Sequence, residues 1–548
     1  MTPTRILGSL ALPVLLAAGT ALADDRNEPD HAHHHDEVLV DDSQPIGQVA
    51  FDADCTPAAS AAFDRALGLM HHMMYVQSRS QFEAITETDP ECAMAHWGVA
   101  TSLFQPLWGT TPEAGEIERA RAAIERAREN VASKRERRLI EATAAFFEPD
   151  TEHLQKRLEG WIDGMESAYE AHPDDLDIAA LYSLSRLTRA LWADNRDELH
   201  DEAETILHGI WERENTHPGA IHYAIHATDA DGRAENALAM VESYGSIAPA
   251  VPHALHMPSH IYVRLGDWPE VIDWNTRSAE AALDHEVNGA ISFHFIHAID
   301  YLVYGHLQRG EDSTAERVWR TARDKGRHQA GFPGAFHLAA IPARLAVEQR
   351  DWSAAATIEP RVPDYVDWDR FYWPEALAWF ARGLGAVHTG DIDEAHRAEH
   401  RLSELGEAAE TAADARFSTY IEIDRLILGA WMKHASDQPG AAIEKMRAAA
   451  ELEGSVEKHP VTPGALLPPN EALGDLFMEL DQPAEALEAY ARSDAIWPGR
   501  YQTLLGAARA AAKADQPSVA AEWSARLLDT APASERTSTD EIAAAADR

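Results

Sequence analysis

Apolar residues recur at helical spacing almost throughout the chain from about residue 57, and the alternation typical of strands is scarce. Short breaks rich in Gly, Asp and Pro interrupt the helical pattern. These breaks lie at Gly266, Gly310, Arg350, Gly390, Asp437, Asp481 and Asp515. Their spacing is 34 residues near the C-terminus and in the 40s upstream. The pattern predicts an all-α protein made of repeated helix-turn-helix units.

The unit nearest the C-terminus has the residue order of a tetratricopeptide repeat (TPR). The matching positions are Leu473, Gly474, Phe477, Asp481, Ala486, Tyr490 and Pro498. In such a unit small residues let two helices approach, aromatic rings fill the gap, and Pro stops the second helix. We therefore expect a TPR-like α-solenoid, a right-handed superhelix whose concave groove is lined by the first helix of each unit. One array with a histidine-rich groove is expected over 53–350, and a C-terminal array over 351–532.

The two ends of the chain differ from this pattern. Residues 1–23 combine one Arg, a short apolar run and a small-x-small end, which predicts a secretory signal peptide cleaved near Ala23-Asp24 and a periplasmic or secreted protein. Residues 24–52 are acidic and polar, which predicts a disordered leader. A histidine tract at 31–35 within it is either a loose metal trap or a compositional accident. Residues 533–548 are expected to form a disordered tail.

Charge narrows the choice of partners. The chain has 47 basic and 91 acidic residues, a net charge of −44, which argues against nucleic acid and anionic membranes. After the signal no apolar run reaches the length of about 18 residues that a membrane span needs. The two cysteines, Cys55 and Cys92, form a disulfide in an oxidising compartment or remain free thiols.

Histidines are concentrated where the predicted groove should be. The pattern His-x-x-x-His occurs twice, in His222 with His226 and in His256 with His260, and residues four apart share one face of a helix. Counted from the tight turns, the groove-facing positions of four successive units carry mainly histidine, with Asp, Tyr and Arg. Those residues are His222, His226, Asp229, His253, His256, His260, His297, Asp300, Tyr304, His337 and Arg344.

This register predicts a metal site, because neutral imidazole suits Zn and Cu. Packed helices lie roughly 8–10 Å apart, so histidine pairs on adjacent units can converge on one ion. The predicted ligands are His222, His226, His256, His260 and His297. Two alternatives remain open at this stage: the histidines are packed, hydrogen-bonded core groups, or they form the floor of a peptide-binding groove.

The remaining polar groove residues are expected to bind a ligand. They are His72, His253, Asp229, Asp300, Tyr304, His337 and Arg344. Among them Asp300 is the candidate catalytic acid or base, and Tyr304 and Arg344 are expected to contact a bound anion. Neither histidine pair carries the glutamate of the HExxH motif, so a zincin mechanism is not predicted.

Several segments resemble a large family of exported bacterial TPR proteins. They are CTPAASAAFDRALGLMHHMMY, FEAITETDPECAMAHWGVA, HPGAIHYAIHATD, APAVPHALHMPSHIYVRLGDW and HAIDYLVYGHLQ, with the PHALHMPSHI string as the most specific part. The resemblance covers roughly residues 55–350. It implies an all-helical superhelix, export and an intact histidine groove, and it implies no settled activity.

The sequence thus favours an exported TPR binding protein whose groove holds a transition metal and a peptide, protein or small ligand. One alternative is a metal-dependent enzyme, hydrolytic or oxidative, that uses the same site. The other is a metal-free scaffold for protein assembly.

Overall fold

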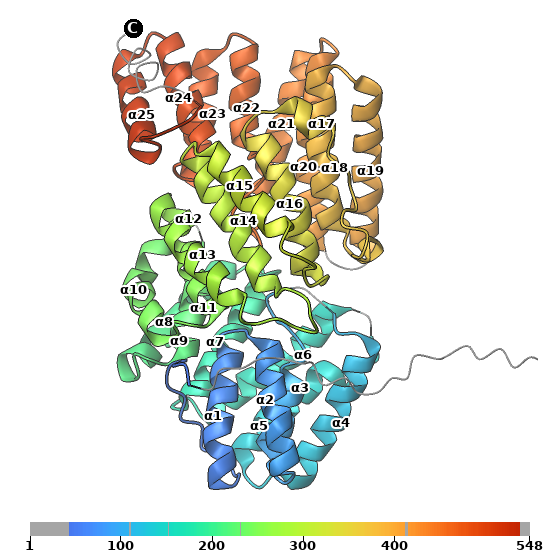
Figure 1. Ribbon diagram of the computed structural model, residues 1–548, viewed down its shortest axis with the longest axis vertical. Helices are drawn as coiled ribbons and strands as arrows, with labels where there is room; N and C mark the ends of the chain where they lie inside the picture. The colour runs from blue at the N-terminus through green and yellow to red at the C-terminus, as the bar shows by residue number, and fades with distance from the viewer. Residues whose placement is uncertain (1–42, 109–110, 152, 231, 412–414, 537–548) are drawn as a thin grey trace, which may run out of the picture. The chain divides into compact units, whose positions relative to one another are not determined.

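Helices follow one another as hairpins along the chain of this computed structural model (Figure 1). The structure describes residues 43–108, 111–151, 153–230, 232–411 and 415–536. The chain separates into two units, 1–35 and 36–548, and all described residues belong to the second. Within the described residues, β-structure is limited to two isolated bridges, Val287 with Ala290 and Ile291 with His328.

The first half of the array reaches α13. Its helices are α1 (Pro57–His71), α2 (Tyr75–Thr88), α3 (Ala93–Thr101), α4 (Ala114–Asn130), α5 (Lys134–Phe147), α6 (Leu154–Ala171), α7 (Leu176–Ala190), α8 (Arg196–Arg213), α9 (Pro218–Thr228), η1 (Ala234–Ala237), α10 (Leu238–Ile247), α11 (Pro252–His256), α12 (Pro258–Leu265) and α13 (Trp268–Ala282).

The second half continues in the same way. Its helices are α14 (Phe293–Gln308), α15 (Asp312–Arg323), α16 (Phe332–Glu348), α17 (Trp352–Ala356), η2 (Trp368–Arg370), α18 (Tyr372–Thr389), α19 (Ile392–Thr411), α20 (Ala415–Ala435), α21 (Pro439–Glu453), α22 (Pro469–Glu479), α23 (Pro483–Ile496), α24 (Tyr501–Lys513) and α25 (Pro517–Thr530).

Packing between helices follows the order of the chain. Each helix lies against the next, and first helices also lie against the first helix of the following unit, as α14 does against α16, α18 against α20 and α22 against α24. Such nearest-neighbour stacking defines a solenoid. The protein is an all-α, TPR-like solenoid, as the sequence predicts.

The breaks in the sequence pattern are the tight turns of the structure. Gly266, Arg350, Asp437, Asp481 and Asp515 all have positive φ, between 55° and 69°, where one helix gives way to the next. The TPR-like unit also packs as expected. A Cβ added to Gly474 would lie 2.6 Å from the Tyr490 ring, so only glycine lets the paired helices approach this closely.

The predicted boundaries need correction at three places. Residues 43–52, placed in the leader, pack on the array: Phe51 is buried, and the Gln48 amide donates to the Thr216 carbonyl. Residues 533–536, placed in the tail, also contact the array, where the Glu535 amide donates to the Gly310 carbonyl. The two larger of the three buried cores of the described residues meet in the 279–304 region, whereas the sequence predicts a division at residue 350.

Other N-terminal predictions concern residues outside those described. They are the signal peptide, the histidine tract and the leader up to residue 42. Among the described helices, none is both long and apolar enough to cross a membrane. Near the start of the array, Cys55 and Cys92 are joined in a disulfide that ties the segment before α1 to the N-terminus of α3.

Candidate metal centre

Successive first helices of the array carry the predicted histidines. His222 and His226 lie on α9, His297 lies on α14, and His337 on α16. The segment between α9 and α14 differs from expectation. It is broken after His256, because Pro258 has no N–H to continue the helical ladder. His256 and His260 therefore belong to two short helices, yet their rings meet edge to face with centroids 4.9 Å apart.

The structure divides the predicted ligands into two groups. His256, His260 and His297 form the first trio, and His222, His226 and His253 form the second. In each trio one nitrogen per ring lies within 4.8 Å of the others. All six rings are buried. The single converging site that the sequence predicts is thus two adjacent groups, and His253, expected only to bind a ligand, completes the second.

Hydrogen bonds fix the tautomers of His256 and His260. The Asn275 amide nitrogen donates to the Val271 carbonyl, so its oxygen must accept from His256 Nδ1–H, 2.7 Å away. His260 Nδ1–H donates to the Asp229 carboxylate at 2.8 Å. With both Nδ1 atoms protonated, the Nε2 atoms of these neutral rings are bare.

The third ring of the first trio is fixed through a relay. His337 Nδ1–H donates to the Asp300 carboxylate at 3.0 Å, which leaves His337 Nε2 as an acceptor. His297 Nδ1–H donates to that Nε2 at 2.7 Å. His297 Nε2 is therefore bare as well. The first trio presents three unprotonated Nε2 atoms, each backed by a hydrogen bond from its own Nδ1–H, the arrangement that orients histidine ligands of metals.

A short distance in this trio points to a cation. His256 Nε2 and His260 Nε2 lie 3.1 Å apart. Two bare nitrogens at this distance repel each other unless a proton or a metal ion lies between them. Two ligands of a tetrahedral zinc, each bonded at about 2.0–2.1 Å, stand ~3.3 Å apart. The spacing therefore suits a shared metal.

Burial disfavours a proton between these two nitrogens. It lowers the pKa of His256 and of His297 well below the ordinary value, and the neighbouring imidazoles lower both further. Burial also lowers the pKa of His260, although the Asp229 carboxylate opposes this. The rings are consequently neutral at pH 7, and neutral imidazole is the form that binds a metal.

Two buried carboxylates accept hydrogen bonds from histidines of the first trio or from a histidine bonded to it. Asp229 accepts from His260, from Arg264 Nε at 2.8 Å and from Lys458 Nζ at 2.8 Å. Asp300 accepts from His337 and from Arg344 Nε at 2.9 Å. These cations hold the pKa of both carboxyl groups below the ordinary value, against the effect of burial. Asp229 and Asp300 thus orient imidazoles.

Three residues make contacts that differ from the roles predicted for them. Asp300, the candidate catalytic acid or base, is fully buried with both oxygens engaged and reaches the trio only through His337. The Tyr304 hydroxyl accepts from Arg500 Nη1 at 2.7 Å. Arg344 is paired within the protein. It binds Asp300 and the carbonyl of Gly464.

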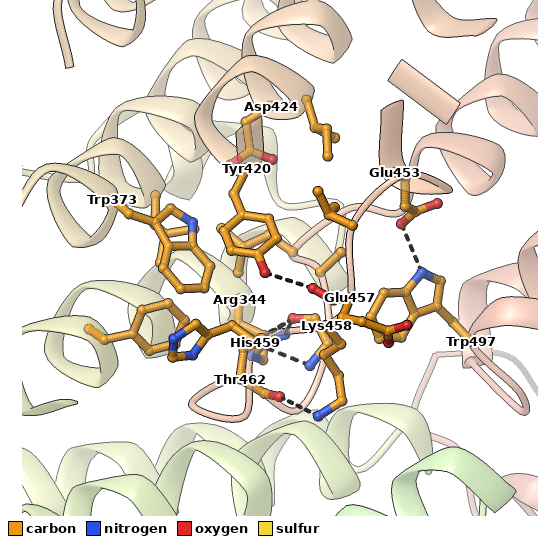
Figure 2. A pocket seen from close by; sticks show the side chains of 17 residues that line it. Arg344, Trp373, Tyr420, Asp424, Glu453, Glu457, Lys458, His459, Thr462 and Trp497 are labelled. Carbon is orange, nitrogen blue, oxygen red and sulfur yellow. Dashed lines mark hydrogen bonds between the residues drawn. The ribbon is translucent and has the colours of Figure 1, made fainter. Parts of the chain in front are cut away.

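The groove over the histidines is covered by the protein's own chain. Residues 454–468, here called the strap, link α21 to α22 and pass over the first trio. Tyr301 hydroxyl donates to the carbonyls of Pro460 and Thr462, and Lys458 Nζ reaches Asp229. Figure 2 shows Lys458 and Thr462 of the strap, with Arg344 close to Thr462. The strap therefore occupies the place where the sequence predicts an open histidine floor.

Cavities lie on both sides of the strap. On its outer side a cavity of ≈ 80 Å³ is walled by Trp373, Tyr420 and Trp497 (Figure 2). On its inner side a cavity of ≈ 20 Å³ lies against the histidines. The inner cavity borders both trios, and its lining includes His226, His253, His260, His297, His459 and Val461. A volume of about 10–15 Å³ is enough for one water molecule, so this space admits a very small molecule.

A third buried group was not predicted as a site. Asp177 accepts from His71 Nε2 at 2.9 Å and from His217 Nε2 at 3.2 Å. His217 Nδ1 accepts from the Ala220 amide, so its Nε2 carries the proton. These bonds use the nitrogens that a metal would need, and they favour a structural role. His72, predicted to bind a ligand, is equally committed, to the Ile46 carbonyl and the Tyr244 hydroxyl.

Sequence reasoning missed Asn275 and Lys458. Asn275 occupies a position on the buried stripe of α13, four residues after Val271, where an apolar residue is expected. A polar amide at this apolar position could have identified Asn275 from the sequence as a partner of a buried polar group. Lys458 lies 229 residues from Asp229 in an irregular segment, and no local pattern links the two residues.

Comparison with known proteins gives no family assignment. No protein-family model and no curated protein matches the chain. Solved structures with some likeness include yeast Tom70, at 11% identity and a TM-score of 0.31 over 89% of this chain and 88% of that chain. The Cut9–Hcn1 hetero-tetramer of APC/C has 12% identity and a TM-score of 0.34 over 89% of this chain and 90% of that one. A monomeric mutant of IFIT1 with m7Gppp-AAAA has 10% identity and a TM-score of 0.36 over 80% and 90%. Likeness of this degree carries no argument about function.

Proposed function

We propose that the protein is an exported metal-binding solenoid whose first trio holds one transition-metal ion. The observation that carries this proposal is the 3.1 Å approach of His256 Nε2 and His260 Nε2, with both Nδ1–H groups already committed. A buried pair of this kind is costly without a cation between the two nitrogens. His297, held by His337, supplies the third nitrogen.

Zinc and copper are the proposed ions, because imidazole nitrogen suits both. Export is supported by the disulfide between Cys55 and Cys92, since disulfides persist in oxidising compartments. The strap covers the first trio, so it keeps the ion away from bulk water and slows its exchange.

Metal analysis of the purified chain tests this proposal. The chain lacking residues 31–36 removes the histidine tract, and the His256→Ala/His260→Ala variant removes two ligands of the first trio. We expect one ion per chain with and without the tract, bound far more weakly in the variant. His328→Ala is the matched control, because His328 is buried but bonds the Ala322 carbonyl away from both trios. Equal ion content and affinity in wild type and the double variant would contradict the proposal.

An enzyme is the second candidate, and the inner cavity favours it. Catalytic zinc sites have three protein ligands and one open position for water, whereas structural sites have four protein ligands. The first trio supplies three nitrogens, and His260 and His297 border a cavity of ≈ 20 Å³. That volume restricts any substrate to a very small molecule.

Hydration of CO₂ is a suitable probe of this second candidate, because metal-bound water with a lowered pKa attacks small electrophiles. Turnover by the zinc-loaded chain that disappears in His297→Ala would support an enzyme. A loaded chain with the rate of buffer alone would leave binding as the function. If the chain holds no ion at all, both candidates fail and the metal-free scaffold remains.

A further inference from the structure

The second trio has buried nitrogens with no partner. Within the described part of the chain, His222 Nε2, His226 Nε2 and both ring nitrogens of His253 are buried without a hydrogen bond. Such groups are rare in folded proteins, and each needs an explanation. Here they belong to three rings whose nitrogens lie within 4.8 Å of one another.

The tautomer of His222 can be assigned. Its Nδ1 lies 2.7 Å from the His71 carbonyl oxygen, which only accepts, so Nδ1 carries the proton and Nε2 is bare. The backbone thus supports one ring of this trio. No polar group among the described residues supports His253, whose ring contacts Trp108 and His294. The second trio can offer nitrogen ligands, with less orientation than the first.

The two trios meet at the inner cavity. His226 and His253 of the second trio and His260 and His297 of the first line the same space. Ring centroids of His226 and His260 lie 5.8 Å apart, and those of His253 and His256 lie 5.9 Å apart. An ion that leaves one trio therefore reaches nitrogens of the other within a few ångströms, without entering bulk water.

Charge argues against simultaneous occupation. The two carboxylates next to the first trio, Asp229 and Asp300, are already paired with Lys458, Arg264 and Arg344. Imidazole side chains bring no negative charge that could offset a second ion. Two dications this close would repel each other with little compensating charge.

We propose that the second trio is an alternative station for the same ion, which passes between the two trios through the shared cavity. This inference rests on the proposed function of the first trio. The first trio is the tighter station because its rings are oriented by hydrogen bonds. The second is a transfer station, from which the ion is taken up and released.

Calorimetric titration with Zn²⁺ of metal-stripped protein tests this proposal with three variants. Variant one, His256→Ala/His260→Ala, removes the first station. Variant two, His222→Ala/His253→Ala, removes the second. The quadruple variant removes both. We expect one ion per wild-type chain, and one ion in variant one with an affinity about 10–100-fold lower, the range by which supporting groups change metal affinity. Variant two should bind one ion at nearly wild-type affinity but take it up more slowly, and the quadruple variant should bind none.

The outcomes separate this proposal from the one on which it rests. If wild type binds one ion and variant one binds no more than the quadruple variant, the second station is refuted while the first trio stands. If wild type and variant one bind alike, the first trio is refuted. Two ions per wild-type chain would overturn the alternating use of the stations.

Folding must be checked in the same samples. Helical circular dichroism and thermal unfolding of each metal-free variant should match those of His328→Ala. If variant two unfolds, His253→Phe replaces it, because Phe keeps a ring against Trp108 and has no nitrogen. Visible bands of tetrahedral Co²⁺ provide a second readout, and we expect the spectrum of variant one to differ from that of wild type, since a different trio holds the ion.

Discussion

The two trios share residue type, burial and spacing. They differ in the groups that accept hydrogen bonds from the rings. In the first trio Asn275, Asp229 and His337 each accept an Nδ1–H. In the second, only His222 has such an acceptor among the residues that the structure describes, and none of those residues bonds either nitrogen of His253. The difference teaches that three clustered histidines do not make equal metal sites, because their partners decide which nitrogen is bare and how firmly it is aimed.

The distance between the trios limits how both can be used. Ring centroids of the two trios lie 5.8 and 5.9 Å apart. At a separation of this size, roughly 6 Å, two dications repel by about 11 kcal/mol at an effective dielectric of about 20, and two monovalent ions by about 3 kcal/mol. Structural zinc in zinc-finger peptides binds with about 10–16 kcal/mol. A second dication would lose most of its binding energy, so the comparison favours one ion shared between two unequal stations.

The largest expected effect comes from removing one ligand. His297→Ala should lower Zn²⁺ affinity about 100-fold, the upper limit of the loss expected when the second trio holds the ion instead. His226→Ala, the counterpart in the second trio, should lower it much less. Competition with a chromophoric chelator measures both. Similar losses in the two variants would mean that the trios are equivalent, contrary to the hydrogen-bond pattern.

Removal of a supporting group should have a smaller effect. Asn275→Leu fills similar space but cannot accept His256 Nδ1–H, so we expect zinc affinity about 10-fold lower, the lower end of the range for supporting groups. Asn236→Leu is a control of the same type at an exposed amide that bonds Glu204. Unchanged affinity in Asn275→Leu would show that the first trio does not owe its strength to this partner.

Acid should destabilise the metal-free protein. The pKa of His226 is lowered to about 3 in the folded state against an ordinary value of 6.5, so between these values only the unfolded chain takes up the proton. Stability is therefore fully present above pH 6.5 and falls as the pH drops toward 3. At pH 5 this histidine alone accounts for a loss of about 2 kcal/mol. Urea unfolding at pH 7 and pH 5 measures the loss, which should shrink by about that amount in His226→Gln.

The smallest expected effect concerns the strap. Lys458→Met keeps the packing of the side chain but removes the ion pair with Asp229, so the strap should open more often. We expect zinc exchange to be several-fold faster. The equilibrium affinity for zinc should change less than it does in Asn275→Leu. Release of ⁶⁵Zn into excess cold zinc gives the rate. An unchanged rate would mean that the ion leaves by a path that does not involve the strap.

The sequence by itself determined the repeating helices and their turns. Residues such as Gly266 and Asp481 mark the ends of helices because the backbone there has positive φ, a local property. The four-residue spacing of His222 and His226 places them on one face of a helix, which is also a local property. Local geometry also set the close approach of Gly474 to Tyr490.

The tertiary structure alone decided how the histidines divide and which of them are supported. His260 meets Asp229 across 31 residues, His297 meets His337 across 40, and Asp229 meets Lys458 across 229. These contacts depend on the rotation between successive units and on the path of the strap, to which small differences along the whole array contribute. A periodic pattern specifies which face of a helix is polar. Whether the histidines on that face come within a few ångströms of one another, as a shared metal requires, is set by the helices and loops that pack against it.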